Sequence, residues 1–93
     1  MAKYLLMGKY TLGALKGISA DRTKEAMRVI ERSNGKVSVM YALLGDYDII
    51  LIVDFKDNSE AMKASISLAN LTGISFSTYP AVTVQEFDKI ADK

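Results

Sequence analysis

Hydrophobic and polar residues along the chain switch between the spacing of a strand and the spacing of a helix. Runs rich in Tyr, Leu, Ile, Val and Met are typical of strands. We expect four of them, over residues 3–10, 36–44, 48–55 and 74–80. The last run ends at Pro80, which has no N–H to donate to a neighbouring strand. We therefore expect the fourth strand at an edge of the sheet.

The first segment with helical spacing covers residues 21–33. Its apolar residues recur at the intervals that place them on one side of a helix. Asn34-Gly35 then offers a residue that accepts the left-handed conformation, which is typical of a helix end. The expected buried stripe consists of Thr23, Ala26, Met27 and Ile30.

A second helix is expected from Asp57 to Thr72-Gly73, because Asp57 and Glu60 have the spacing of a capping box. A short third helix is expected from Val84 to Ala91, anchored by Phe87 and Ile90. The inner stripe of the second helix comprises Ala61, Ala64, Ser65, Leu68 and Leu71, and a second apolar stripe comprises Met62, Ile66 and Ala69.

The connections complete the expected architecture. Residues 11–19 contain two glycines and predict a loop, with room for one helical turn. Gly45-Asp46 predicts a tight hairpin, with glycine where a two-residue type II′ turn needs it. The order β-α-β-β-α-β plus a terminal helix is that of a ferredoxin-like α+β fold. Residues 1–93 form one domain.

The first and third strands are central, antiparallel neighbours in this topology. A register that pairs Lys3 with Asp54, Leu5 with Ile52, Met7 with Ile50 and Lys9 with Asp48 gives ion pairs at both ends and an apolar middle. The opposite face then carries Tyr4, Leu6, Gly8 and Tyr10 against Val53, Leu51, Ile49 and Tyr47. We expect the helices to cover this second face.

The first face is left without helices and is apolar. It presents Leu5, Met7, Ile50 and Ile52, and the second strand adds Val37, Val39, Tyr41 and Leu43. Apolar patches of this size are uncommon on monomers. We expect a homodimer through this face, since a two-fold axis covers both copies at once. The alternative is that the terminal helix folds across the face. The second stripe of the helix at 57–72 could support a higher oligomer.

Composition excludes several kinds of chemistry. The 93 residues contain no His, Cys or Trp, and the net charge is +1. Thiol nucleophiles, Cys/His zinc sites and serine–histidine triads are therefore ruled out. No basic patch suggests nucleic acid or an anionic membrane. We expect no catalytic residue, metal or cofactor. No signal or transmembrane segment is apparent, so we expect a cytoplasmic protein.

One end of the sheet gathers the candidate ligand-binding residues. Tyr10 ends the first strand, Tyr47 begins the third, and Arg22 lies at the start of the first helix. An arginine at a helix N-terminus favours a carboxylate or phosphate, and the two tyrosines could enclose an apolar body. A small anionic ligand is one reading. The other is that the tyrosines close the core and Arg22 is solvated.

Three further positions leave alternatives open. Tyr41 could line a cavity between subunits or serve as an interface aromatic. Asp48 could belong to the ligand site or pair with Lys9. A metal site from Asp46, Asp48 and Asp54 is less favoured than turn and ion-pair roles, because an oxygen-only site needs more converging ligands. Gly8 could let a helix approach or leave room for a ligand.

Three segments resemble the GYD-domain family: Tyr4-Leu5-Leu6-Met7-Gly8-Lys9-Tyr10-Thr11, Arg22-Thr23-Lys24-Glu25-Ala26 and Leu44-Gly45-Asp46-Tyr47-Asp48. The resemblance extends from the first strand to Phe87. It implies a dimeric α/β barrel and no particular reaction. Residues 45–50 are also similar to the ligand-sensing domain of feast/famine regulators, in which such a hairpin helps form an effector site between subunits. No helix-turn-helix precedes it here, so operator binding is not expected.

Three functions remain in view from the sequence. The leading hypothesis is a homodimeric module that binds or senses a small molecule through Tyr10, Arg22, Tyr41, Tyr47 and Asp48. The second is a cofactor-independent enzyme, similar to the monooxygenases or isomerases among dimeric α/β barrels. Many of those enzymes use histidine, which is absent here. The third is a structural or protein-interaction module.

Overall fold

The computed structural model describes residues 1–92. Its elements follow the predicted order with one added short helix, α1. They are β1 (Ala2–Tyr10), α1 (Leu12–Lys16), α2 (Ala20–Arg32), β2 (Lys36–Ala42), β3 (Ile49–Phe55), α3 (Asn58–Thr72), β4 (Ile74–Ala81) and α4 (Val84–Ala91). The bounds of α4 are those predicted from the sequence.

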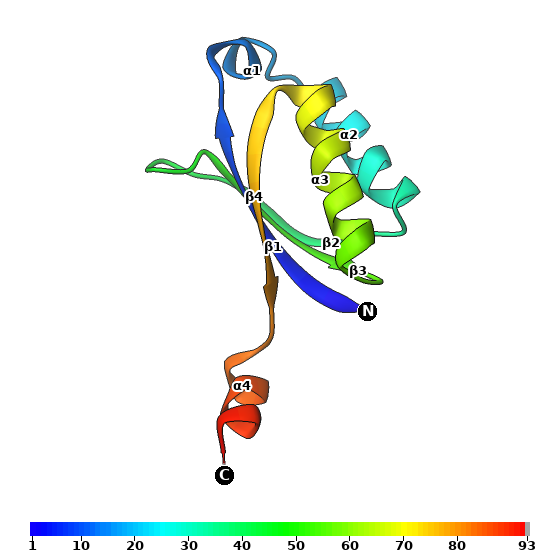
Figure 1. Cartoon of the computed structure of the whole chain (residues 1–93). Helices are drawn as coiled ribbons and strands as arrows, with labels where there is room; N and C mark the ends of the chain where they lie inside the picture. Colours follow the sequence, from blue (N-terminus) through cyan, green and yellow to red (C-terminus); the bar gives the residue numbers. More distant parts are fainter. Residues whose placement is uncertain (93) are drawn as a thin grey trace.

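The strands form one antiparallel sheet in the order β2-β3-β1-β4. α2 and α3 lie side by side on one face of this sheet, and the other face carries no helix (Figure 1). The architecture is α+β and compatible with the ferredoxin-like arrangement. β4 is an edge strand, as its proline predicted. We call the face opposite α2 and α3 the open face.

The predicted register between the central strands is confirmed over most of its length. Lys3 pairs with Asp54, Leu5 with Ile52 and Met7 with Ile50. Lys3 Nζ lies 3.3 Å from Asp54 Oδ1, so the predicted ion pair at this end forms. Alternating residues on β1 are therefore either buried under the helices or directed to the open face.

The predicted ion pair at the other end is wrong. The Asp48 carboxylate accepts a hydrogen bond from the Tyr10 backbone N–H at 2.8 Å, while Lys9 Nζ lies 5.4 Å from the centre of the Tyr47 ring. Asp48 directly precedes β3, and its backbone lies beside β1: its N–H donates to the Gly8 carbonyl at 2.8 Å, while its carbonyl accepts from Leu43 N–H at 2.8 Å. Its side chain therefore reaches the end of β1 instead of a neighbouring lysine.

β2 departs from the predicted alternation because of a bulge between Val37 and Val39. Val37 pairs with Val53 and packs against the core, whereas Val39 pairs with Ile52 on the open face. Placing Val37 on the open face was therefore wrong. A bulge inserts one unpaired residue, here Ser38, and so shifts every residue before it to the opposite face.

The hairpin between β2 and β3 is longer than a two-residue turn. β2 ends at Ala42, and the loop is closed by a hydrogen bond from Leu43 N–H to the Asp48 carbonyl at 2.8 Å. Gly45 has no positive φ, which a type II′ turn would require. That turn type was wrong, and Leu43 lies in the loop rather than in the strand.

Local side-chain chemistry fixes where the helices begin and end. The Asp57 side chain accepts from Glu60 N–H at 3.0 Å, which confirms the predicted cap of α3. Gly73 ends α3 in the left-handed conformation with φ of 74°, and Asn34 adopts φ of 58° after α2. Ser19 caps α2 by accepting from Arg22 N–H at 3.0 Å.

The core lies between the sheet and the two packed helices. Its buried residues are Tyr4, Leu6, Ile30, Leu51, Val53, Phe55, Ala61, Ala64 and Leu68. The inner stripe of α3 is confirmed at both alanines and Leu68, but Leu71 is exposed and Thr72 is buried in its place. Thr72 is satisfied there because its hydroxyl donates to the Leu68 carbonyl at 2.7 Å.

The C-terminal segment extends away from the rest of the molecule (Figure 1). We call residues 82–92 the terminal arm. All of them are exposed, so the alternative in which the terminal helix folds over its own sheet is wrong. The accessible surface is 6356 Å², compared with about 5,300 Å² expected for a compact monomer of this mass. The arm and the open face account for an extended, incompletely covered shape.

Within residues 1–92, no helix is both long and apolar enough to cross a membrane.

Candidate functional site

The predicted ligand site corresponds to a cavity between α2 and the sheet. Tyr10, Arg22, Thr23, Ala26, Met40 and residues of β3, α3 and β4 line it. Its volume is about 40 Å³, whereas sites for small organic molecules typically enclose roughly 300–1,000 Å³. The cavity therefore has room for a few water molecules or a small ion, but not for a metabolite.

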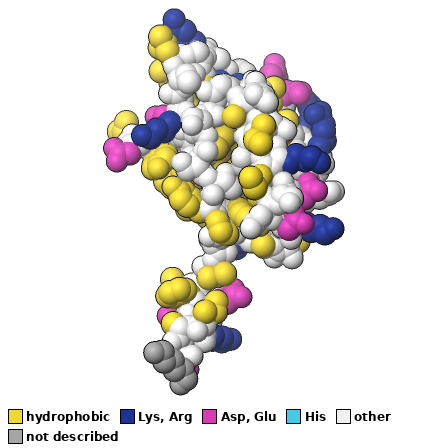
Figure 2. Space-filling model, in the orientation of Figure 1, with side chains coloured by type: hydrophobic (Ala, Val, Ile, Leu, Met, Phe, Trp, Pro, Cys, Tyr) yellow, Lys and Arg dark blue, Asp and Glu magenta, His cyan; other side chains and the backbone are white. Residues whose placement is uncertain are grey.

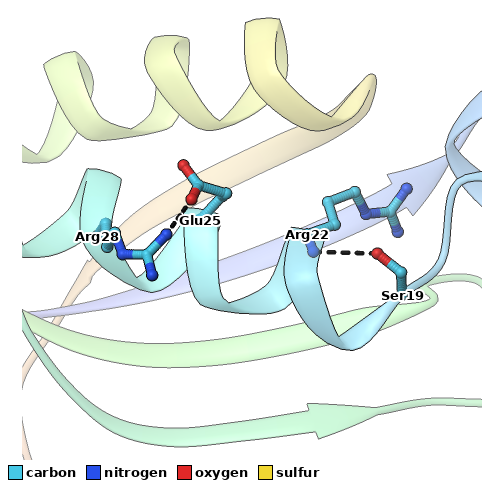
Figure 3. A network of polar contacts seen from close by, with 4 residues as sticks. All are labelled: Ser19, Arg22, Glu25 and Arg28. Carbon is cyan, nitrogen blue, oxygen red and sulfur yellow. Dashed lines mark hydrogen bonds and ion pairs between the residues drawn. The ribbon is translucent and has the colours of Figure 1, made fainter.

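Arg22 is held at this cavity by contacts within the chain. Its guanidinium donates to the Ala14 carbonyl and lies 5.7 Å from the centre of the Tyr10 ring. Figure 3 shows the side chain pointing away from the Glu25–Arg28 pair that follows it on α2. Arg22 thus connects α2 with α1 and with the end of β1. These contacts occupy part of the guanidinium that could otherwise bind an anion.

The structure brings only some of the predicted site residues together. Tyr10 and Arg22 share the cavity, and Asp48 reaches the Tyr10 backbone. Tyr47 does not line the cavity and contacts Lys9 instead. Tyr41 is 64% exposed and pairs with Ile50 on the open face, on the other side of the sheet. The five residues do not form a single site in one chain.

Gly8 is required by packing within the sheet. A Cβ added there would lie 2.7 Å from Ile49 Cγ2, 2.7 Å from Ile74 Cγ2 and 2.9 Å from Phe76 Cε1. Side chains of β3 and β4 therefore occupy the space above it. Neither a helix nor a ligand takes this position.

The acidic residues predicted as turn and ion-pair residues do not converge. In residues 1–92 there is no group of three or more carboxylates that could hold a metal ion. Asp54 pairs with Lys3, and Asp48 accepts from Tyr10 N–H.

The open face carries a continuous set of apolar side chains. Cross-strand pairing aligns them in two rows: Val39, Ile52, Leu5 and Tyr79 in one, and Tyr41, Ile50 and Met7 in the other. We call these seven residues the apolar belt. Tyr79 is 46% exposed, and the sequence reasoning had not placed it on this face. Tyr79 is assigned to this face only by the register of β4 with β1, which pairs it with Leu5.

A second surface lies on the outer side of α3. Met62 and Ile66 are exposed one helical turn apart, as the second stripe predicted. Beside them, Tyr4, Asn58, Ala61, Met62, Thr78 and Pro80 line a cleft of about 200 Å³ between α3 and β4. No pattern along the chain indicates the cleft, because it combines residues from three separate elements.

Comparison with known proteins agrees with this architecture. A family model described as GYD domain matches residues 4–91. A Thermus thermophilus protein named glutamine synthetase and cystathionine beta-lyase binding protein is 31% identical over 67 residues, covering 71% of this chain and 70% of that protein. The structure of a homoserine dehydrogenase from Thiobacillus denitrificans superposes on 85% of this chain with a TM-score of 0.56 and 17% identity. The matched part is 17% of that dehydrogenase chain, and the likeness concerns the fold alone.

Proposed function

Because the chain belongs to the GYD domain family, we propose that it is a non-catalytic binding module that forms a homodimer and binds another protein. The observation that carries the proposal is the pair of unpartnered apolar surfaces, the open face and the outer stripe of α3. The cavity at Tyr10 and Arg22, by contrast, is too small for a metabolite.

The open face supports the homodimer. Leu5, Met7, Ile50 and Ile52 lie at its centre and are only half-buried. A two-fold axis would let one apolar patch cover its own copy, which is the commonest way that identical chains associate. The surface excess of roughly 1,000 Å² over a compact monomer is in the range that one partner buries in a stable interface. The dimeric α/β barrel remains a prediction of this arrangement.

The outer surface of α3 supports the protein partner. Met62 and Ile66 project from one side of the helix, and the adjacent cleft could accept one apolar side chain of a partner. Methionine adapts to irregular surfaces and is common at binding interfaces. The name of the Thermus thermophilus relative specifies two enzymes that it binds. An enzyme subunit is therefore the proposed partner class here.

The experiment uses the glutamine synthetase and the cystathionine β-lyase of the organism from which this chain comes. Each enzyme is titrated with the purified chain by calorimetry. We expect at least one to bind. Ile66→Asp should weaken that binding at least tenfold, or about 1.4 kcal/mol, because it places a charge on the contact surface. Leu71→Asp is the matched control, because Leu71 is also an exposed apolar residue of α3 but lies about 140° around the helix from Ile66. Absence of binding to both enzymes would overturn the protein-partner proposal.

A small anion is a second candidate ligand, favoured by the position of Arg22 beside the cavity. Binding would require the guanidinium to leave the Ala14 carbonyl. Titration with inorganic phosphate, followed by the amide signals of Thr23 and Ala26, tests this. Saturable shifts that disappear in Arg22→Gln would support it, and unchanged signals would overturn it.

A further inference from the structure

The terminal arm has the properties of a segment that packs on another surface. Val84, Phe87 and Ile90 lie on one side of α4 and are 76%, 58% and 68% exposed. Figure 2 shows apolar side chains gathered on this projecting segment. An isolated helix of eight residues is only marginally stable in water. The apolar side of α4 is not covered by the rest of the described chain, so its burial needs a surface from another molecule.

We propose that α4 of each chain packs on the open face of a second copy, so that the two chains exchange their terminal arms. The proposal rests on the homodimer proposed above, but it places the partner's α4, rather than the partner's sheet, over the apolar belt. A reciprocal exchange would bury the apolar belt and the apolar side of α4 against each other in both copies. It is also compatible with a two-fold axis that crosses the strands, because each arm leaves its sheet along the strand direction (Figure 1).

Size and charge both match between the two surfaces. A helix of this length is about 12 Å long, and a belt across four strands is roughly 14 Å wide between the outer strand axes. The strand residues on the open face include Lys3, Lys9, Lys36 and Asp54, which gives a formal charge of three minus one, or +2. Residues 84–93 of the sequence contain two lysines against Glu86, Asp88 and Asp92, a formal charge of two minus three, or −1. Opposite charges at the rim of an apolar contact favour this pairing over like-charged alternatives.

The absence of native cysteine makes the contact directly testable by disulfide trapping. Phe87→Cys and Met7→Cys chains are prepared separately, one of them labelled with ¹⁵N, then mixed and oxidised in a glutathione buffer. We expect the mixed-mass disulfide dimer to dominate, because Phe87 of one chain would face the belt of the other. Lys89→Cys, on the opposite side of α4, is the matched control and should give at least tenfold less cross-linking to Met7→Cys.

Two results would overturn the arm exchange. One is efficient Met7→Cys homodimer cross-linking without the mixed product, which would mean that the sheets pack directly while the homodimer stands. The other is a dimer whose dissociation constant is unchanged by Phe87→Asp, measured by analytical ultracentrifugation. Under the proposal, Phe87→Asp weakens the dimer at least about 30-fold, whereas Gln85→Ala on the polar side changes it less than about threefold. If neither candidate enzyme binds, the protein-partner proposal is overturned, but the arm exchange is not affected.

Discussion

The two faces of the same sheet differ in how their apolar residues are covered. On the helix side, Leu6 and Val53 are completely buried under α2 and α3. On the open side, the neighbouring Leu5 and Ile52 remain half-buried, and Tyr41 is mostly exposed. Composition is similar on both sides, so the difference lies in what the chain can supply. Two packed helices cover one face, and no helix of residues 1–92 covers the other.

The two faces of the sheet therefore contribute to different properties of the protein. The covered face provides the stability of the single chain, because close packing there excludes water. The open face is only partly buried in the single chain, and under the proposal it provides the area for association. Substitutions on the two faces should therefore change different measurements.

The largest expected effect is on the covered face. Phe55 is fully buried and packs edge-to-face against Tyr4, with ring centres 5.7 Å apart. Phe55→Ala should lower the free energy of unfolding by about 3–5 kcal/mol, through lost burial and a cavity. Urea unfolding at fixed protein concentration measures it. A loss below about 1 kcal/mol would mean that this face is not the stabilising core.

The next effect concerns association rather than folding. Ile50→Asp places a charge at the centre of the apolar belt, so we expect the dimer dissociation constant to rise about 100-fold, or 2.7 kcal/mol. Light scattering should then show the 10.2 kDa chain as a folded monomer. Ile66→Asp, the same change on the outer stripe of α3, should leave the dimer intact. A wild-type chain that is monomeric at micromolar concentration would contradict the role of the open face.

The smallest effect tests packing within the covered face. Gly8→Ala introduces a methyl group that contacts Ile49, Ile74 and Phe76 at under 3.0 Å. Overpacking of this kind should cost about 1–3 kcal/mol of unfolding free energy. Gly45→Ala is the control, since an added Cβ there meets nothing within 4 Å. Equal unfolding midpoints for the two variants would show that the space above Gly8 adjusts freely.

At the candidate site, the sequence-based prediction located Tyr10 and Arg22 but not the contacts that hold Arg22. It correctly placed Tyr10 and Arg22 next to one another, because strand ends and helix starts follow from local pattern. It did not predict that Arg22 would be engaged by Ala14, since α1 was expected only as a loop with room for one turn. The remaining volume of the cavity depends on how side chains from six elements pack, and no local pattern contains that information.

The sequence by itself determined the four strands, the three longer helices, the N-terminal cap of α3, most of the register of β1 with β3, and the presence of an uncovered apolar face. These features follow from alternation, capping residues and cross-strand pairing, which act over short stretches or between two strands. Only the tertiary structure decided the bulge that turns Val37 inward, the hydrogen bond of Asp48 to β1, and the position of the terminal arm. The bulge and the hydrogen bond each join groups that are far apart in the sequence, and the arm is placed by what does not pack against it within residues 1–92. The outcome therefore depends on the complete arrangement rather than on any one segment.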